Sequence, residues 1–565
     1  MLPMLRRKFA SRMSVWSELI DMSNAARKSG LPATHERARS FGKKCNRIYE
    51  SMLRRLKAKT DPEASLNWMK VAAEFAWTFH PGRYADGRIE NPALEIGRKL
   101  QHILPKDSTN SATPNVPLRQ NSSRKRVLHV ATTLYPVGGH SRLIKNWIEN
   151  DRNSVHSTLL TDQVGEIPQW MTQTVTENGG CLFTLPSKSS LVQKAWSLRS
   201  IAQDAFDLVV LHPHPHDVVP IVAFGSDDCP PVALMNHADH VFWLGTSIAD
   251  IVLNIRGFAD RISETRRFAK KSFLLPVPLS IPALSVTKPE ARRLLNIPED
   301  QIVLLTISTP YKFTPTDTHD FFVTAGQILT QNPAAHLYVI GIRPDQSDQY
   351  LRDGKIERLH FLGAVEDPTL YRLSADLYLD SMPYGSLMAL LETAAFGVCP
   401  VLMYAPPAPQ YDMSEELEFS GLVTCSESED QYIAKINHLI AHPEVRQEIG
   451  ARARERVLSY HQGKQWQEYL ASAYEQLNRS GHRPAEISNA EFMQTTDDLA
   501  LWDFNHVRYF NSSLLRPTAE KNYQLLTLKD IIVLFLISLT VRDYYSRYDI
   551  RVWLQMLGSK LLRTQ

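Results

Sequence analysis

Two segments near the middle of the chain concentrate imidazole and carboxylate side chains. The first is residues 236–245 (NHADHVFWLG), which follows a short apolar run. An imidazole beside a carboxylate can act as a general base or bind hydroxyl groups, and an indole ring can stack on the flat face of a sugar. We therefore predict His237, Asp239 and His240 as catalytic candidates and Trp243 as an acceptor contact. The alternative for each histidine alone is a buried structural imidazole with satisfied hydrogen bonds.

The second segment is residues 212–217 (HPHPHD), at the predicted end of the strand LVVLH. Alternate side chains of an extended stretch lie on one side, so three imidazoles and a carboxylate could bind a metal ion. No second histidine or acidic cluster of ligand spacing accompanies them. We therefore predict no metal site and assign His212 and His214 to the lining of an acceptor site.

A glycine pair follows the first predicted strand of this region, in residues 135–140 (YPVGGH). Gly138 and Gly139 would let the backbone approach a ligand closely at the start of a helix, where free N–H groups attract anions. His140, the next residue, is assigned with His212 and His214 to the lining of the acceptor cleft. The alternative is a plain tight turn.

Residues 380–401 (DSMPYGSLMALLETAAFGVCPV) predict a strand end, a small-residue turn, a helix and a further buried strand. Gly385 and Ser386 would place N–H groups and a hydroxyl at a helix N-terminus, which suits a diphosphate. Glu392, nearly two turns later, could accept hydrogen bonds from both ribose hydroxyls of the same nucleotide. The alternative is an ordinary exposed glutamate.

The elements that must position these residues form two sets of short apolar runs separated by helical segments. Strands alternating with helices predict βαβ units and parallel sheets, which bind ligands at the carboxyl ends of their strands. We therefore predict an α/β fold of two facing Rossmann-like domains with a ligand cleft between them. The predicted strands are 127–132, 157–160, 181–184, 208–212, 232–236 and 251–254 in the first domain, and 302–308, 336–340, 359–362, 377–380 and 401–404 in the second.

The regions before and after these two sets of strands show helical patterns, and a polar segment connects the first of them to the strands. We predict five parts: a basic helical module at 1–105, a linker at 106–123, a first Rossmann-like domain at 124–280, a second Rossmann-like domain at 281–480 and a helical extension at 481–565. The linker prediction rests on its Ser, Asn, Thr and Pro content.

Charge separates the N-terminal module from the rest of the chain. Residues 1–60 hold 15 Lys and Arg against 4 Asp and Glu, a net charge of +11, while the remainder carries −8. A basic module on an acidic body points to an anionic partner, for which we predict a membrane surface rather than nucleic acid. The alternative is a solvated helical face.

Cysteine use and hydropathy bear on the compartment. The five cysteines are scattered, which favours a reducing compartment over a disulfide framework or a zinc site. The start of the chain lacks the apolar stretch of a secretory signal, and the longest apolar run, residues 531–541, is too short to span a bilayer. We predict a cytoplasmic protein that can associate with the inner face of a membrane, with 544–562 either an interfacial helix or a helix packed on the body.

The segment LETAAFGVCPV resembles the donor-binding motif of GT-B glycosyltransferases, and 359–386, the strand IVLLTIS and the YPVGGH loop resemble other parts of that fold. The resemblance covers roughly residues 125–475. It implies metal-independent transfer of a sugar from a nucleoside diphosphate sugar, a UDP- or GDP-sugar, to a glycan, lipid-linked glycan or protein, with no cofactor. It also implies that Glu392 binds the donor ribose, and that Gly385, Ser386 and Lys312 contact the phosphates. The resemblance makes 124–280 the acceptor domain and 281–480 the donor domain. Gly138 and Gly139 would complete the donor site, and His237 or His240 would correspond to the histidine of the acceptor domain.

Two departures from the family pattern concern the reaction's stereochemistry. Pro400 stands three residues after Gly397 rather than two, and Tyr384 occupies the position of a second glutamate found in many retaining members. The pattern is similar to both a glycogen-synthase-like and an O-GlcNAc-transferase-like branch, and we lean to an inverting enzyme. A catalytically inactive scaffold or sugar-binding protein, and a nucleotide-sugar epimerase, remain alternatives.

Overall fold

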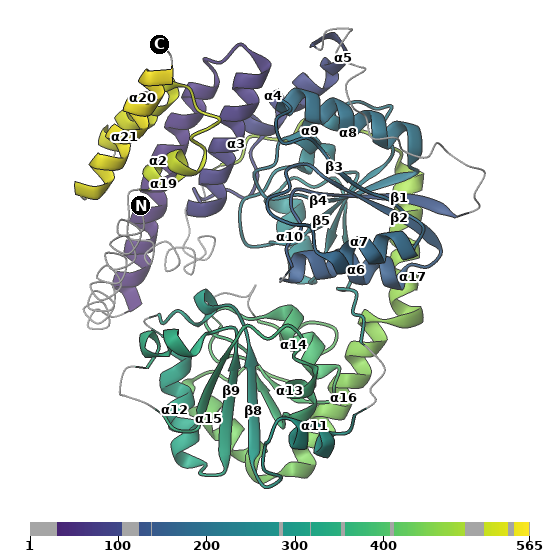
Figure 1. Cartoon of the computed structure of the whole chain (residues 1–565), viewed down its shortest axis with the longest axis vertical. Helices are drawn as coiled ribbons and strands as arrows, with labels where there is room; N and C mark the ends of the chain where they lie inside the picture. The colour runs from purple at the N-terminus through teal and green to yellow at the C-terminus, as the bar shows by residue number, and fades with distance from the viewer. Residues whose placement is uncertain are drawn as a thin grey trace.

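The computed structural model describes residues 31–103, 124–136, 138–281, 286–316, 318–351, 356–406, 412–491, 514–540 and 547–563. Two parallel sheets, each flanked by helices, form two lobes, and a helical module lies beside the first lobe (Figure 1). This is the expected α/β architecture of two Rossmann-like domains. The expected linker at 106–123 lies outside the described residues.

The first sheet has the strand order β3-β2-β1-β4-β5-β6-β7, with every pair parallel. Its central strands are buried apolar runs, as a parallel sheet covered on both faces requires. The strands are β1 (Lys125–Ala131), β2 (Ser154–Leu160), β3 (Leu182–Thr184), β4 (Leu208–His212), β5 (Val232–Asn236), β6 (Ile251–Asn254) and β7 (Ser272–Leu274). The helices are α6 (Gly139–Asn150), α7 (Gln169–Glu177), α8 (Leu191–Ala205), α9 (Val219–Ala223), η2 (Thr246–Ile248) and α10 (Phe258–Thr265).

The second sheet has the order β10-β9-β8-β11-β12, again parallel throughout. Its strands are β8 (Ile302–Ile307), β9 (Ala335–Ile340), β10 (Leu359–Gly363), β11 (Leu377–Leu379) and β12 (Cys399–Val401). Its helices are α11 (Lys288–Leu294), η3 (Pro310–Phe313), α12 (Phe321–Gln331), η4 (Pro344–Gln349), α13 (Thr369–Ser374), α14 (Leu387–Ala394), α15 (Glu429–Ala441) and α16 (Pro443–His461).

Helix α17 (Gly463–Ser480) leaves the second lobe and returns to the first (Figure 1). Trp466 is fully buried and donates from Nε1 to the carbonyl of Pro276, 2.8 Å away. Its ring meets that of Trp147 in α6 edge to face, with centroids 6.1 Å apart. One apolar cluster therefore continues from α6 through α17 into the second sheet.

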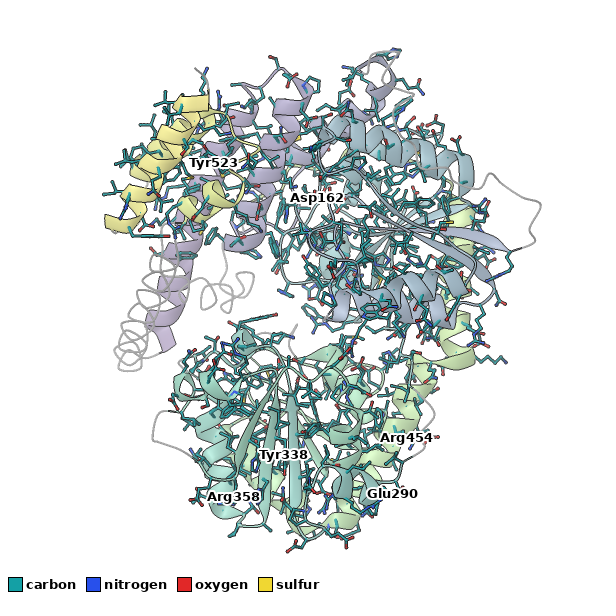
Figure 2. The ribbon with its side chains drawn as sticks, in the orientation of Figure 1. Asp162, Glu290, Tyr338, Arg358, Arg454 and Tyr523 are labelled. Atoms are coloured by element: carbon teal, nitrogen blue, oxygen red, sulfur yellow. The ribbon has the colours of Figure 1, made fainter. Side chains whose placement is uncertain are left out.

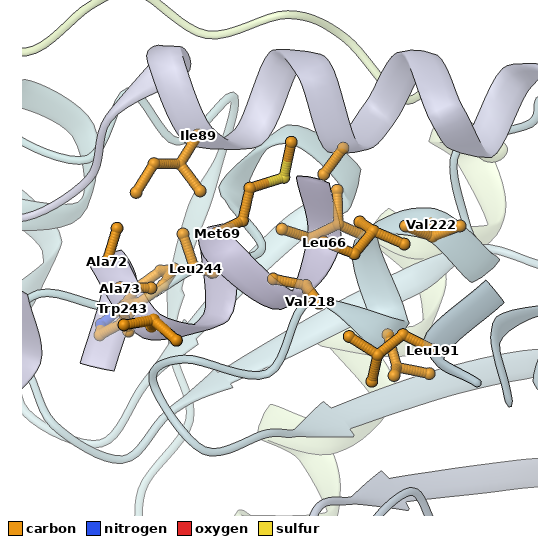
Figure 3. Packing of buried hydrophobic residues seen from close by; sticks show 14 of the residues in the cluster. Leu66, Met69, Ala72, Ala73, Ile89, Leu191, Val218, Val222, Trp243 and Leu244 are labelled. Atoms are coloured by element: carbon orange, nitrogen blue, oxygen red, sulfur yellow. The ribbon is translucent and has the colours of Figure 1, made fainter. Parts of the chain in front are cut away.

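The helical module combines both ends of the chain. It contains α2 (Leu31–Leu56), α3 (Pro62–Phe79), α4 (Gly87–Arg98), α5 (Leu100–Ile103), α19 (Leu515–Lys521), α20 (Leu528–Thr540) and α21 (Arg547–Arg563). Leu66 and Met69 of α3 and Ile89 of α4 pack against the first domain, in the cluster that also holds Trp243 and Leu244 (Figure 3).

Polar contacts fix the module to the first lobe as well. The buried carboxylate of Glu90 accepts from the backbone N–H groups of Gly245 (3.0 Å) and Ser247 (2.7 Å). Lys70 of α3 lies 3.2 Å from Asp162, at the boundary between module and first domain (Figure 2). The module is thus integrated with the first domain rather than tethered to it.

Helices α20 and α21 each bury one face and expose another. Leu534 and Trp553 are fully buried, whereas Leu536 and Leu554 are 52% and 62% exposed. Both alternatives raised for this tail therefore have a physical basis: it packs on the body and still presents apolar side chains. Within the described residues, no helix is long and apolar enough to cross a membrane.

Most of the predicted strands differ from the observed ones by one to three residues at one or both ends, and one edge strand was not predicted. The last strand begins at Cys399 instead of Val401, because Gly397 (φ +82°) turns the chain directly after α14 and the strand starts at once. The edge strand β7 was not expected, since it has three residues and all are only partly buried.

Asp530 provides a test of the module's integrity. It is buried and accepts from Lys59 Nζ (2.6 Å) and Arg55 Nη2 (3.0 Å), so it joins the two ends of the chain. Asp530→Ala leaves two partly buried cations unpaired and should lower the free energy of unfolding by ~3 kcal/mol. Urea denaturation followed by circular dichroism measures this. The exposed neighbour variant Lys529→Ala should change stability by less than about 0.5 kcal/mol; equal effects of the two would contradict this assignment.

Candidate active site between the two sheets

The loops at the carboxyl ends of the two sheets meet, and we call the region where they meet the interdomain site. A Cβ atom on Gly139 would lie 3.1 Å from Met388 Cγ, so the glycine loop directly faces the start of α14. The N–H of Gly257, after β6, donates to Glu416 across the same boundary (3.1 Å). Gly138 has φ +129°, which strongly favours glycine there.

On the second sheet, a buried carboxylate organises the turn between β11 and α14. One oxygen of Asp380 accepts from the N–H groups of Ser381 and Ser386, both at 2.9 Å. A Cβ on Gly385 would lie 2.7 Å from the other Asp380 oxygen, so only glycine fits without a shift. Burial raises the pKa of Asp380 to about 6, against the lowering effect of these N–H groups and of Lys312.

Lys312 and three hydroxyls cluster above this turn. Lys312 Nζ donates to the Gly385 carbonyl (2.8 Å) and to Ser386 Oγ (3.3 Å). The hydroxyls of Ser308 and Ser381 lie 2.6 Å and 3.0 Å from that of Ser386. Burial lowers the pKa of Lys312 to about 8; Asp380 opposes this shift and Arg256 adds to it. An ammonium, hydroxyls and a helix N-terminus in one place suit a diphosphate.

Glu392, which we predicted to bind ribose, is largely buried on α14 and paired with two arginines. One oxygen bonds to Arg372 of α13, and the other lies 3.6 Å from Arg142 Nη1 of α6, in the first domain. Arg142 is the more exposed of the two partners. The Glu392 oxygen that faces Arg142 therefore lies on the more exposed side of this ion-pair cluster.

On the first sheet, the structure brings three of the predicted histidines to the interdomain site. His140 and His237 have ring centroids 4.5 Å apart, and His140 follows Gly139 at the start of α6. His214 lies 3.1 Å from the hydroxyl of Tyr135. His140 Nε2 contacts the carbonyl of His212 (3.0 Å), and its Nδ1 has no hydrogen-bond partner within the described residues. Within the part of the chain that the structure describes, His140 thus has an unbonded ring nitrogen beside the glycine loop.

His212 is fully buried and does not line the site. Its Nε2 lies 3.0 Å from His129 Nδ1, and its Nδ1 lies 2.9 Å from His237 Nε2. Both nitrogens are therefore occupied. Within the described residues, no group of three or more His, Cys, Asp or Glu side chains could hold a metal ion.

The other two catalytic candidates, Asp239 and His240, lie in the loop that follows His237. Asp239 is buried in an ion pair with Arg256 (Nε to Oδ2, 2.9 Å), which lowers its pKa despite burial. His240 contacts the other Asp239 oxygen at 3.3 Å. Asp239 is thus held as an ion-pair partner, and its carboxylate is a weak base.

Trp243 is not brought to the interdomain site. The residue is 5% exposed, the Arg267 guanidinium lies 4.2 Å from the centroid of its ring, and its Nε1 donates to Asn236 Oδ1 (3.1 Å). Arg267 also holds the loop that contains Trp243, because it donates to the carbonyls of Asp239 (2.9 Å) and Val241 (2.7 Å).

Sequence reasoning missed several charged residues of this region. Asp380 ends the run LYLD and Arg256 follows the run IVLN, so their positions at strand ends were the available signal. Arg142 and Arg372 carried no local signal, because their pairing with Glu392 joins three separate helices.

One protein-family model matches part of the chain. Residues 334–472 match the family model described as glycosyl transferase-like. A search of curated proteins by sequence finds no significant match.

Solved structures with a similar arrangement include three at low identity. Anabaena HepE, in complex with UDP and glucose, is 16% identical, with 63% of this chain and 100% of that chain covered and a TM-score of 0.49. An O-GlcNAc transferase mutant of Thermobaculum terrenum is 14% identical, with 80% and 99% covered and a TM-score of 0.45. Sucrose-phosphate synthase of Thermosynechococcus elongatus is 14% identical, with 63% and 100% covered and a TM-score of 0.44.

The two sheets face each other through their carboxyl-end loops, and the family match falls on the second of them and on the α16 and α17 helices that follow. Over residues 334–472, the second Rossmann-like domain is therefore similar to the glycosyl transferase-like family.

Proposed function

We propose that this protein transfers a sugar from a nucleoside diphosphate sugar, of the UDP or GDP type, to an acceptor bound by the first domain. The observation that carries the proposal is the cluster of Lys312, Ser386 and Asp380 at the N-terminus of α14, facing Gly139 of the first domain. It combines a cation, hydroxyls and N–H groups where two α/β sheets present their carboxyl ends.

In this proposal the donor diphosphate lies against Lys312 and the start of α14. As the bond from the anomeric carbon to the diphosphate oxygen breaks, negative charge grows on the leaving group. Lys312 and the Ser386 hydroxyl stabilise that charge without a metal ion or a cofactor. The ribose hydroxyls bind Glu392, displacing Arg142 from the carboxylate oxygen that it faces.

The acceptor hydroxyl loses its proton to His237. Burial lowers the pKa of His237 well below its usual value, and His140 and His214 add to the shift, so the ring is neutral and has a lone pair at neutral pH. A base on the acceptor side and a leaving group on the other domain favour inversion at the anomeric carbon. His140 and His214 then bind the acceptor.

The helical module would bring the enzyme to its acceptor. We propose that its basic residues and the exposed apolar side chains of α20 and α21 contact an anionic membrane surface. Exposed lysines and arginines next to apolar side chains are the pattern of interfacial helices. A lipid-linked glycan is the acceptor class that this contact favours.

Glu392→Ala tests the donor site. Because Glu392 would accept two hydrogen bonds as a charged group, its loss should weaken nucleoside diphosphate binding by tenfold or more, on the order of the 1.5–3 kcal/mol of one such bond. Thermal-shift titration with UDP, GDP, ADP, TDP and CMP, with and without EDTA, measures this. The exposed Glu455→Ala on α16 is the matched control.

The ligand panel also separates the alternatives. A metal-independent shift by one nucleoside diphosphate in the wild type, lost in Glu392→Ala, supports the donor site; product analysis should then find a free nucleoside diphosphate and a glycosylated acceptor. An isomerised sugar would identify an epimerase, and no ligand with any effect would leave a scaffold as the function.

The lowered pKa of Lys312 predicts how nucleoside diphosphate affinity depends on pH. Its pKa is lowered to about 8, so the ammonium is lost as the pH rises through that value. Nucleoside diphosphate affinity should therefore fall about tenfold between pH 7 and pH 9. Lys312→Arg, whose guanidinium stays charged, should remove most of this dependence. Isothermal titration calorimetry at the two pH values decides; equal wild-type affinities would contradict a diphosphate on Lys312.

A further inference from the structure

Four imidazoles form a continuous hydrogen-bonded chain across the first sheet. His237 Nε2 lies 2.9 Å from His212 Nδ1, His212 Nε2 lies 3.0 Å from His129 Nδ1, and His129 Nε2 lies 2.9 Å from His156 Nδ1. The chain ends on Asp151, whose Oδ2 lies 3.2 Å from His156 Nε2. His129, His156 and His212 are fully buried, and His237 alone is partly exposed at the interdomain site.

Asp151, at one end of the histidine chain, determines which nitrogen of each ring carries the proton. His156 Nε2 faces two acceptors, the carboxylate and the carbonyl of Asp151, so this nitrogen must carry hydrogen. A neutral His156 then has a lone pair on Nδ1, which requires His129 to donate from Nε2. The same reasoning passes through His212 to His237, which must donate from Nε2 and keep its lone pair on Nδ1.

Asp151 is itself held by groups from another helix. The Tyr474 hydroxyl of α17 donates to Asp151 Oδ2 (3.1 Å) and accepts from Trp147 Nε1 (3.1 Å). Bonds from His156, Ser154 and Tyr474 lower the pKa of Asp151 although burial opposes them. The carboxylate therefore stays ionised and accepts only.

The remaining titratable neighbours lie at the open end of the chain. His140 of α6 and His214 after β4 face His237, and His214 interacts with Asp217, Lys70, Lys521 and Asp162 at longer range. The Trp147 ring meets those of His129 and His212 edge to face. Apart from Asp151, the described groups that contact the buried rings carry no charge, so a proton entering the chain is stabilised at the Asp151 end.

We propose that Asp151, His156, His129 and His212 are positioning residues that fix the tautomer of His237 and share the proton it takes up. The proposal rests on the proposed function for the identity of that proton. A buried carboxylate at the far end of the chain stabilises an imidazolium, which opposes the loss of basicity that burial imposes on His237. Here three further rings transmit that effect from Asp151 to the interdomain site.

The proton transfers balance along the chain. His237 Nδ1 takes the proton of the acceptor hydroxyl, whose oxygen forms a bond to the anomeric carbon while the diphosphate leaves with the electron pair of the broken bond. The Nε2 protons of His237, His212 and His129 each move to the next Nδ1. His156 becomes an imidazolium beside the Asp151 carboxylate, and reversal of the same steps returns the proton to the site.

The tautomer can be measured on the unliganded protein. Nitrogen NMR of the histidine-labelled full chain, assigned with single-histidine variants, should show His237 and His212 protonated on Nε2 and not on Nδ1 at pH 7. His129→Phe keeps an aromatic ring at this position but breaks the histidine chain, and should allow His237 both tautomers. His360→Phe removes one member of a separate, partly exposed imidazole pair in the second domain, His336 and His360 (2.9 Å), and should leave His237 unchanged.

Kinetics then separate positioning from packing. Asp151→Asn and His129→Phe should each lower kcat at least tenfold with donor KM unchanged, and should move the acidic limb of the kcat–pH profile to lower pH, because His237 becomes less basic. A packing defect alone would not move that limb. Protonation of His237 on Nδ1 in the wild type, or unchanged kcat and profile in both variants, would overturn the proposal.

The two hypotheses fail in different ways. Absence of nucleoside diphosphate binding would reject the proposed function and leave the tautomer result standing. Nucleotide binding and sugar transfer together with an Nδ1-protonated His237 would reject the histidine chain alone.

Discussion

The packing of helix α17 on α6 is the interaction on which both halves of the site depend. Trp466 and Trp147 are fully buried against each other, and Trp466 also donates to the Pro276 carbonyl in the segment that joins the domains. Two turns later, Tyr474 bonds to Trp147 and Asp151. One helix thus sets the relation of the two sheets and anchors the carboxylate at the end of the histidine chain.

The charges of the interdomain site are arranged as compensated pairs rather than as isolated ions. Asp239 pairs with Arg256, Glu392 with Arg142 and Arg372, and Asp380 with backbone N–H groups beneath Lys312. Burying such groups costs desolvation free energy that their pairing only partly offsets. A protein selected for stability alone would place apolar side chains there, so this concentration of charge at the carboxyl ends of two sheets is expected of a ligand site.

Local patterns were sufficient for the elements that are buried along their whole length. The strands at 208–212, 232–236 and 251–254 have the predicted bounds, because a parallel sheet covered on both faces demands continuous apolar runs. The turn with Gly385 and Ser386 was also readable, since a small-residue turn before a helix has a local signature. What the sequence could not reveal was long-range: Arg267 covers Trp243 from outside its segment, and Arg142 reaches Glu392 from the other domain.

The histidine chain is a further long-range arrangement that local sequence patterns could not reveal. His129 and His156 stand singly within apolar strands and look like ordinary core positions, and only the register of β1 with β2 and β4 brings their rings into line with His212.

The most direct test of the whole account is a crystal structure of the full chain with a nucleoside diphosphate. We expect the phosphates within hydrogen-bond distance of Lys312 Nζ and the start of α14, the ribose hydroxyls on Glu392 and the β-phosphate facing His237. A nucleotide bound elsewhere, with the Arg142–Glu392 pair intact, would contradict it.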